Sequence, residues 1–459
     1  MLEFLTKDVT ISFRKLLAIT LLFFSSFTWL FVLCTYFDII MPITTHSVDI
    51  LTTSGHVWFL LNFGHLVFLA SIAVTAFIGS AVVQKLNLRK FLFFWLIIGI
   101  IAPLPALFFQ SEEILLVFSC LVGATLGFGF PSILSFLADS TTPEERGRVA
   151  AFVIFTSFFL YLLTVRIIDY WAYDFFHFVP PGSWLHQYIP IAIILMLMGL
   201  KSIGFFSFII DPLSKAKSKP KTWSSILGFK NFKNYLLAYI FFSIAFGLTP
   251  MLWQPMFNNL TIENASIFRL EYDFRLFLLG FVMLFAGVTA DKFGRKKLVI
   301  LGFLMLIPEA VFARFMLSSI AQGIMMALYL AIPGDLSSPG SREKSYAICW
   351  ILPLSIWLAI GSIERTAWRY WTDVAVWSPI IATSPDGRFL RDYWNFGSLG
   401  YVFLPPELFT IIYFILIAVS ILLIVLAVET ISESKMQERK FRDYAEKVEN
   451  MIQETEKED

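Results

Sequence analysis

The sequence predicts an all-α membrane protein in which twelve transmembrane helices form two pseudo-symmetric six-helix bundles. The first observation behind this fold is composition, since 58% of the 459 residues are hydrophobic and only 15% are charged. A soluble protein of this length cannot bury so much apolar side chain without lipid as part of its solvent. The other two observations are a series of long apolar segments and an internal repeat. The composition argues against a soluble enzyme, and no enzymatic activity is expected.

A helix needs about 17–25 mostly apolar residues to cross the hydrocarbon core of a bilayer. The first apolar run is too long for the apolar region of a signal peptide, and no small-residue cleavage site follows it. It is therefore interpreted as the first span. The predicted spans cover residues 16–42, 57–83, 90–109, 113–137, 148–171, 187–210, 234–256, 274–290, 298–316, 318–334, 346–363 and 406–428.

Lysine and arginine are concentrated in alternate connections. They occur before the first span and after spans two, four, six, eight and ten, whereas segments 43–56 and 172–186 contain neither. Because cytoplasmic loops carry the excess of basic residues, both termini are predicted to be cytoplasmic. The expected setting is the lipid bilayer of a cell membrane, with the protein as a monomer and without a nucleic-acid partner.

The spans divide the chain into four parts. An N-terminal bundle is predicted over residues 1–210, a cytoplasmic basic linker over 211–233, a C-terminal bundle over 234–428 and a cytoplasmic charged tail over 429–459. The cysteines lie in apolar stretches, and neither a CxxC pair nor a Cys/His cluster has the spacing of a metal site. Neither a metal nor a cofactor is therefore expected.

Two short sequences recur six spans apart. Gln84-Lys-Leu-Asn-Leu-Arg-Lys90, after span two, matches Asp291-Lys-Phe-Gly-Arg-Lys-Lys297, after span eight. Residues 138–148, after span four, match residues 334–344, after span ten. Parallel repeats of this kind place a solute site at their interface near the middle of the membrane. The equivalent pairs in the second match are Asp139 with Asp335, Pro143 with Pro339, and Arg146 with Arg342.

The segment Gly287-Val-Thr-Ala-Asp291-Lys292-Phe-Gly294-Arg295-Lys296 resembles the signature loop of the major facilitator superfamily, with Lys292 where arginine is commoner. Residues 143–148, Pro-Glu-Glu-Arg-Gly-Arg, are similar to the same family's loop between spans four and five. With the span number, the charge bias and the repeat, the resemblance covers nearly the whole chain. It implies a transporter built from two six-helix halves.

The loop before span nine is short enough to need a tight turn. Gly294 is therefore expected at positive φ, and its repeat partner Asn87 is the next most tolerant residue there. The resemblance implies that Asp291 faces the first residues of span five, around Gly147 and Arg148. Free N–H groups and the helix dipole at that place favour a carboxylate.

By the same resemblance, Arg295 should pair with Asp335, so that the loop latches the two halves on the cytoplasmic side and favours the outward-open state. In the first half, Gln84 and Leu88 replace the acidic and basic residues of the motif, so a charged latch is expected only in the second half. The alternative is that the basic loop only fixes topology. The predicted cytoplasmic gate motif comprises Gly287, Asp291, Lys292, Gly294, Arg295, Lys296 and Asp335, with first-half counterparts Asp139, Arg146 and Arg148.

Ionisable side chains inside spans are costly, so each is a candidate for handling solute or protons. Lys201, near the middle of span six, either points inward or snorkels to the cytoplasmic face. Glu309, about 11 residues into span nine, lies near the midplane and is a candidate proton carrier. His65 either titrates near neutral pH or packs as a hydrogen-bonded histidine. The other candidates are Arg166, which a pair with Asp169 would also explain, and Asp38 near the outer end of span one.

The triplets Asn259-Leu-Thr261 and Asn264-Ala-Ser266 are glycosylation sequons on the predicted outer loop between spans seven and eight. They are usable only where the host glycosylates.

The sequence thus predicts a secondary active transporter that moves a small organic solute by alternating access, with symport of protons or sodium ions left open. Residues 149–171, in span five, contain neither glycine nor proline, which argues against a drug/proton antiporter of the family. The alternatives are a passive facilitator and a transport-inactive relative that acts as a receptor or scaffold.

Overall fold

A computed structural model of the chain describes residues 10–43, 54–105, 112–178, 188–213, 221–257, 262–312, 315–360 and 406–430. Every regular element within these ranges is helical. The first half contains α2 (Phe13–Ile43), α3 (Ser54–Val82), the 3-10 turn η1 (Val83–Lys85), α4 (Leu88–Ile101), α6 (Glu112–Asp139), α7 (Pro143–Phe178), α8 (Tyr188–Ile203) and α9 (Phe206–Ile210).

A short helix, α10 (Trp223–Leu227), lies in the predicted linker and precedes the second half. That half contains α11 (Lys230–Phe257), α12 (Ile262–Phe293), α13 (Arg295–Phe312), α14 (Phe315–Leu336), α15 (Arg342–Tyr346), the π-helical segment η3 (Ala347–Ile351) and α19 (Pro406–Val425). Helix continues after η3 as far as residue 360.

Each predicted span coincides with one of these helices. Helices α8 and α9 together occupy the sixth, and α15, η3 and the helix to residue 360 occupy the eleventh. Eight helices in the described ranges are long and apolar enough to cross a membrane, by length and composition. The boundaries differ most in α12, which begins at Ile262 rather than at 274, and in α4, which ends at Ile101 rather than at 109.

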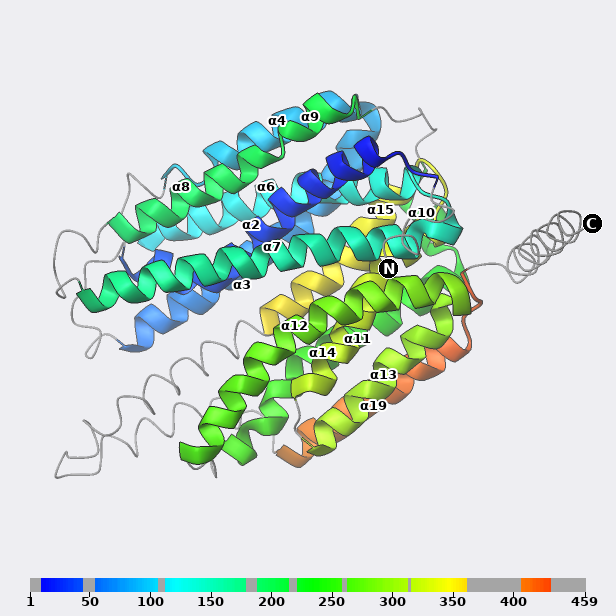
Figure 1. The fold of residues 1–459 in the computed structure, drawn as a ribbon. Helices are drawn as coiled ribbons and strands as arrows, with labels where there is room; N and C mark the ends of the chain where they lie inside the picture. Colours follow the sequence, from blue (N-terminus) through cyan, green and yellow to red (C-terminus); the bar gives the residue numbers. More distant parts are fainter. Residues whose placement is uncertain are drawn as a thin grey trace, which may run out of the picture.

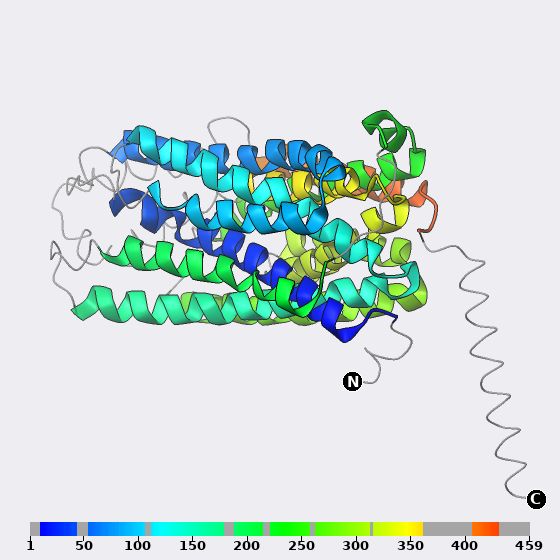
Figure 2. The ribbon, with the colours of Figure 1, turned by 90° about the horizontal axis from the view of Figure 1, so that it is seen from above.

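The long helices lie roughly parallel in two groups, α2–α9 and α11–α19 (Figure 1). The starts of α2, α7 and α15 and the ends of α6 and α14 gather at one end (Figures 1 and 2). That end carries the loops rich in lysine and arginine and is called the basic end below. The pseudo-symmetric repeat segments lie there.

The outward faces of the helices are apolar. On α12, for example, Phe277, Phe281 and Phe285 recur every fourth residue and are 50%, 49% and 57% exposed. Soluble monomers rarely expose such continuous apolar stripes, so these faces suit contact with lipid. A buried apolar cluster runs through both halves behind them.

Side chains at the basic end determine where the helices begin. Glu145 caps the start of α7, because its carboxylate accepts from the Thr142 N–H at 2.9 Å, and Pro143 occupies the first helical position. Gly294, before α13, has φ 91°, as its sequence predicts.

The expectation that Asn87 shares this backbone conformation is wrong. Asn87 has φ −73°, and its side chain caps α4 by accepting from the N–H groups of Arg89 and Lys90. An asparagine can cap a helix from extended backbone, whereas glycine has no side chain with which to do so. The two repeats therefore start equivalent helices by different means.

Several predictions concern residues outside this description. Asn259 and the tail beyond residue 430 lie outside the described ranges, as do residues 214–220 of the linker. Asn264 belongs to α12, which begins at Ile262, so the second sequon is not in a loop as predicted.

Candidate functional site

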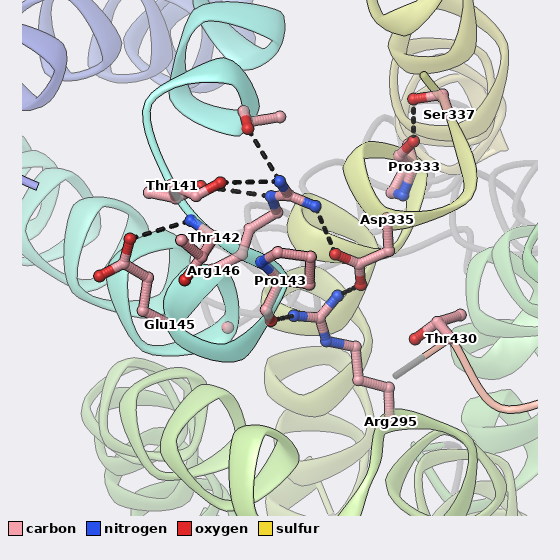
Figure 3. A network of polar contacts seen from close by, with 12 residues as sticks. Thr141, Thr142, Pro143, Glu145, Arg146, Arg295, Pro333, Asp335, Ser337 and Thr430 are labelled. Carbon is pink, nitrogen blue, oxygen red and sulfur yellow. Dashed lines mark hydrogen bonds and ion pairs between the residues drawn. The ribbon is translucent and has the colours of Figure 1, made fainter. Parts of the chain in front are cut away.

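Charged side chains from both halves meet in the interior of the basic end. At the centre, Asp335 near the end of α14 forms ion pairs with Arg146 at the start of α7 and with Arg295 at the start of α13 (Figure 3). All three side chains are at most 1% exposed. Because α7 belongs to the first half and α14 to the second, the Arg146–Asp335 pair joins the two halves.

Backbone carbonyl groups of the loop between α6 and α7 hold the two guanidinium groups in place. Arg146 Nη2 donates to the carbonyl oxygens of Ala138 and Thr141, both at 2.8 Å. Arg295 Nη2 donates to the Pro143 carbonyl oxygen at 2.8 Å, which is a second contact between the halves. A buried guanidinium needs several acceptors, and this loop supplies them at fixed positions.

A second, reciprocal ion pair lies beside the first. Arg342, at the start of α15, pairs with Asp139 at the end of α6 and also donates to the Ala138 carbonyl oxygen at 3.0 Å. Each repeat thus contributes one arginine that binds the aspartate of the other. The expectation of a charged latch in the second half alone is therefore wrong for this pair of loops. The replacement of the motif's acidic residue by Gln84 affects a different contact.

That other contact is made by Asp291, which lies against the start of α7 as the resemblance implies. Its two carboxylate oxygens accept from the N–H groups of Gly147 at 3.0 Å and Arg148 at 2.8 Å. Arg148 Nε and Arg295 Nη2 lie 3.5 and 3.4 Å from the same carboxylate. A helix N-terminus and two guanidinium groups therefore compensate one buried anion.

Two glycines let α7 and α12 approach closely enough for this contact. A Cβ atom on Gly287 would lie 2.2 Å from Ala151 Cβ and 2.3 Å from the Gly147 carbonyl oxygen. A Cβ atom on Gly147 would lie 2.3 Å from Asp291 Oδ1. Gly287 in the predicted motif is thus required by packing between the halves.

The remaining motif residues act within the second half. Lys296 Nζ donates to the carbonyl oxygens of Val425 and Ala427, at 2.8 and 2.7 Å, and so ties α13 to the end of α19. Lys292 is exposed. Sequence reasoning missed Glu429, whose carboxylate accepts from the N–H groups of Arg295 and Lys296 and caps α13. Its only sequence signal was an acidic residue just after the last span.

An aromatic cluster connects the halves away from the charged groups. Trp350 of η3 packs against Phe130 of α6 and Phe23 of α2, with ring centroids 5.4 and 6.4 Å apart. Phe27 stacks on Phe23 at 5.2 Å. All four rings are at most 1% exposed. Charged and aromatic contacts together leave the basic end closed.

Lys201 is buried inside the first half rather than snorkelling. Its ammonium group lies 3.7 Å from the Trp95 ring and 5.5 Å from the Trp29 ring, and it donates to Ser26 Oγ at 3.1 Å. Gly99 makes room for it, since a Cβ atom there would lie 2.7 Å from Lys201 Cε. Among the described residues it has no acidic partner, so the aromatic faces offset part of its desolvation cost.

Glu309 is buried inside the second half and is fully shielded from solvent. Its neighbours are Arg275 of α12, Ser318 of α14 and Tyr413 of α19, whose hydroxyl donates to the Leu306 carbonyl oxygen at 3.0 Å. Neither carboxylate oxygen has a well-formed hydrogen bond within the described part of the chain. A carboxylate in such a place is costly unless it is paired or carries a proton.

The structure describes the side chain of one further candidate. His65 is buried on α3 in the first half. Asp38 lies on α2 and Arg166 on α7, and their side chains fall outside the description. In the described ranges, no three metal-ligating side chains are clustered.

Two helical halves, lipid-suited outer faces and a closed, charge-lined interface at one end define an integral, multi-pass membrane protein of the transporter type. The chain belongs to the Major Facilitator Superfamily, whose family model matches residues 20–307. Members of this family are transporters, which agrees with the expectation drawn from the Gly287–Lys296 segment. A comparison with curated protein sequences gives no significant match.

Solved structures with the same fold include the human organic anion transporter MFSD10 (TETRAN), with a TM-score of 0.59 and 16% identity. The match covers 90% of this chain and 99% of that one. The proton:xylose symporter XylE, bound to 6-bromo-6-deoxy-D-glucose, matches with a TM-score of 0.56 and 16% identity over 91% of this chain and 96% of its own. At this identity the likeness concerns the fold.

Proposed function

We propose that the protein is a secondary active transporter that moves a small organic solute by alternating access, with the basic end facing the cytoplasm. The observation that carries this proposal is the reciprocal Arg146–Asp335 and Arg342–Asp139 pairing across the interface. Buried ion pairs add little net stability compared with apolar contacts, because desolvation cancels most of their attraction. Charges in an interface are therefore suited to one that must open, since each group regains water when the halves separate.

In this proposal, residues 1–210 and 234–428 rock as two bodies about a central solute site, and the closed basic end represents the outward-facing state. Asp291, Arg295 and Asp335 form the gate that must break before the site opens to the cytoplasm. Proteins of the same fold include a proton:xylose symporter and an organic anion transporter. Their substrates support a small solute as the substrate here but do not distinguish a sugar from an organic anion.

The first test is solute flux in proteoliposomes that contain the purified protein. Asp291→Asn should slow uptake roughly tenfold, because the variant keeps the shape but loses charge-assisted bonds to the start of α7. The measurement is initial uptake of labelled xylose and labelled benzoate, chosen to represent a sugar and an organic anion. The matched control is Asp211→Asn, which lies outside the interface after α9.

Unchanged uptake with Asp291→Asn would show that the latch is not part of the transport cycle. No uptake of any solute by the unmodified protein, after a wider thermal-shift screen for ligands, would favour the receptor or scaffold alternative. Uptake that ignores imposed pH and sodium gradients would favour a passive facilitator.

We further propose that protons drive uptake and that Glu309 carries the coupled proton. Support comes from its complete burial and from the adjacent Arg275. A proton on Glu309 would cancel one charge of this pair, so solute movement can be linked to proton uptake and release on opposite sides.

Glu309→Gln imitates the protonated side chain permanently. Solute exchange between equal internal and external pools should continue, whereas stimulation of uptake by an inward proton gradient should be lost. Glu144→Gln, on the half-exposed side of α7, should leave both activities unchanged. Retained stimulation in Glu309→Gln would remove Glu309 from the coupling mechanism.

A further inference from the structure

The interface at the basic end has two faces, and only one has the carboxylate latch. On the face where α7 meets α12, Asp291 binds the start of α7. On the opposite face, α3 meets α15, and the residue equivalent to Asp291 is Gln84. Gln84 Nε2 donates to the Gly340 carbonyl oxygen at 2.9 Å, a single neutral contact. The equivalent of Gly147 there is Glu343, which is buried, so this position has a side chain where the other face has a glycine.

The linker occupies this weaker face. The ring of Trp223, in α10, lies 5.4 Å from the ring of Phe77 on α3, in the first half. Lys344 of α15, in the second half, places its ammonium group 5.4 Å from the Trp223 ring and donates to the Lys221 carbonyl oxygen. The Lys221 N–H donates to the Gly340 carbonyl oxygen at 3.2 Å, the same atom that Gln84 contacts.

Apolar packing fixes the other side of α10. Ile226 is buried and belongs to a small cluster with Ile348 and Cys349 of η3, against which Phe77 and Trp223 also pack. This cluster is separate from the main core. Residues 221–227 therefore contact α3 of the first half and α15 and η3 of the second at the same time.

We propose that residues 221–227, the linker strap, take the place of the missing carboxylate latch and hold the basic end closed on the α3/α15 face. When α3 and α15 separate, Trp223 must leave either Phe77 or Lys344, because it cannot follow both. The strap thus favours the closed state with contacts that opening destroys. It also explains why the first-half motif can have Gln84 in place of an acidic residue while both faces of the interface stay closed.

This inference rests on the proposed alternating access, but its test measures exposure of the basic end and needs no solute. If no solute flux is observed, the strap can therefore still be tested. If the labelling test contradicts the strap, the proposed role of Asp291 in the gate is unaffected. The reporter is a cysteine introduced by Ala138→Cys, at a fully buried position whose carbonyl oxygen accepts from Arg146 and Arg342. Native cysteines are replaced by alanine, and maleimide labelling is timed in detergent.

Trp223→Ala should speed labelling of the reporter roughly fivefold, since one aromatic pair and one cation–π contact no longer favour the closed state. Trp223→Phe, which keeps a ring, should restore most of the protection. Phe229→Ala removes an exposed aromatic ring just after α10 and should have no effect. Unchanged labelling in folded Trp223→Ala would overturn the proposal.

A second variant guards against a folding defect in Trp223→Ala. Lys344→Gln keeps Trp223 and its apolar packing but removes the ammonium group that binds the Lys221 carbonyl oxygen. It should speed labelling in the same direction by a smaller factor. If Lys344→Gln leaves labelling unchanged, or if Phe229→Ala changes it as much as Trp223→Ala, the strap is wrong.

Discussion

Asp335→Asn is expected to be the most destabilising single substitution at the basic end. It removes the anion that pairs with both Arg146 and Arg295, each at most 1% exposed. Arg295 keeps Asp291 at 3.4 Å, whereas the buried Arg146 loses its ion-pair partner. Breaking a buried pair in this way costs about 3–5 kcal/mol, because one charge stays buried and uncompensated. The purified variant should unfold roughly 6–10 °C below the unmodified protein in a thermal-unfolding measurement.

The repeat supplies a matched control for this experiment. Asp139→Asn removes the equivalent aspartate, but its pair with Arg342 is 13–14% exposed and Arg342 keeps the Ala138 carbonyl oxygen. Its expected cost is about 1 kcal/mol, since water replaces part of the lost interaction. An equal or larger loss of stability in Asp139→Asn would show that Asp335 is not the centre of the network.

Much of the fold and part of the gate could be predicted, because in membrane proteins a short segment of sequence is enough to indicate a span or a tight turn. Backbone groups in lipid must be satisfied within each helix, so apolar length alone predicts the spans. The positive φ of Gly294 was predictable for a similar reason, because a tight turn in a short loop requires it. The place of Asp291 beside Gly147 was instead implied by the resemblance to the family's signature loop.

The reciprocal ion pairing was harder to predict from the sequence, because equivalence between repeats does not show which side chains face each other. Asp139 and Arg342 were recognised as repeat partners of Asp335 and Arg146, yet their contact depends on how the halves are docked. Trp223 was hidden for the same reason. A short helix in a basic linker has no periodic signal, and its role appears only where Phe77 and Lys344 converge on it.

Buried charges show a further limit of sequence reasoning. Lys201 and Glu309 were both identified as costly residues within spans, but their surroundings differ in kind. Lys201 lies between aromatic rings in the first half, whereas Glu309 lies beside Arg275 and Tyr413 in the second. Only the neighbours of each side chain in the structure distinguish Lys201, a cation held by aromatic faces, from Glu309, a carboxyl group for which we propose proton exchange.

Gly287→Ala should hold the basic end open, although alanine normally stabilises a helix by about 1 kcal/mol relative to glycine. Its Cβ atom would lie 2.2 Å from Ala151 Cβ and 2.3 Å from the Gly147 carbonyl oxygen, so α7 and α12 cannot keep their present separation. Backbone atoms of a packed helix cannot yield to such a contact as a flexible side chain can. The cysteine introduced by Ala138→Cys should then react with maleimide at least tenfold faster, a shift of about 1.4 kcal/mol in the closed-to-open equilibrium.

The control lies on the same helix, two turns away. Gly280→Ala places its Cβ atom 3.5 Å or more from its neighbours, which is ordinary van der Waals contact, so it should leave labelling unchanged and keep or raise thermal stability. The comparison separates crowding between the halves from any general effect of a methyl group on α12. Equal labelling rates in the two variants would mean that the glycine contact does not control closure. Faster labelling in Gly287→Ala alone would assign the motif's first glycine to the gate, through the space it leaves rather than through backbone freedom.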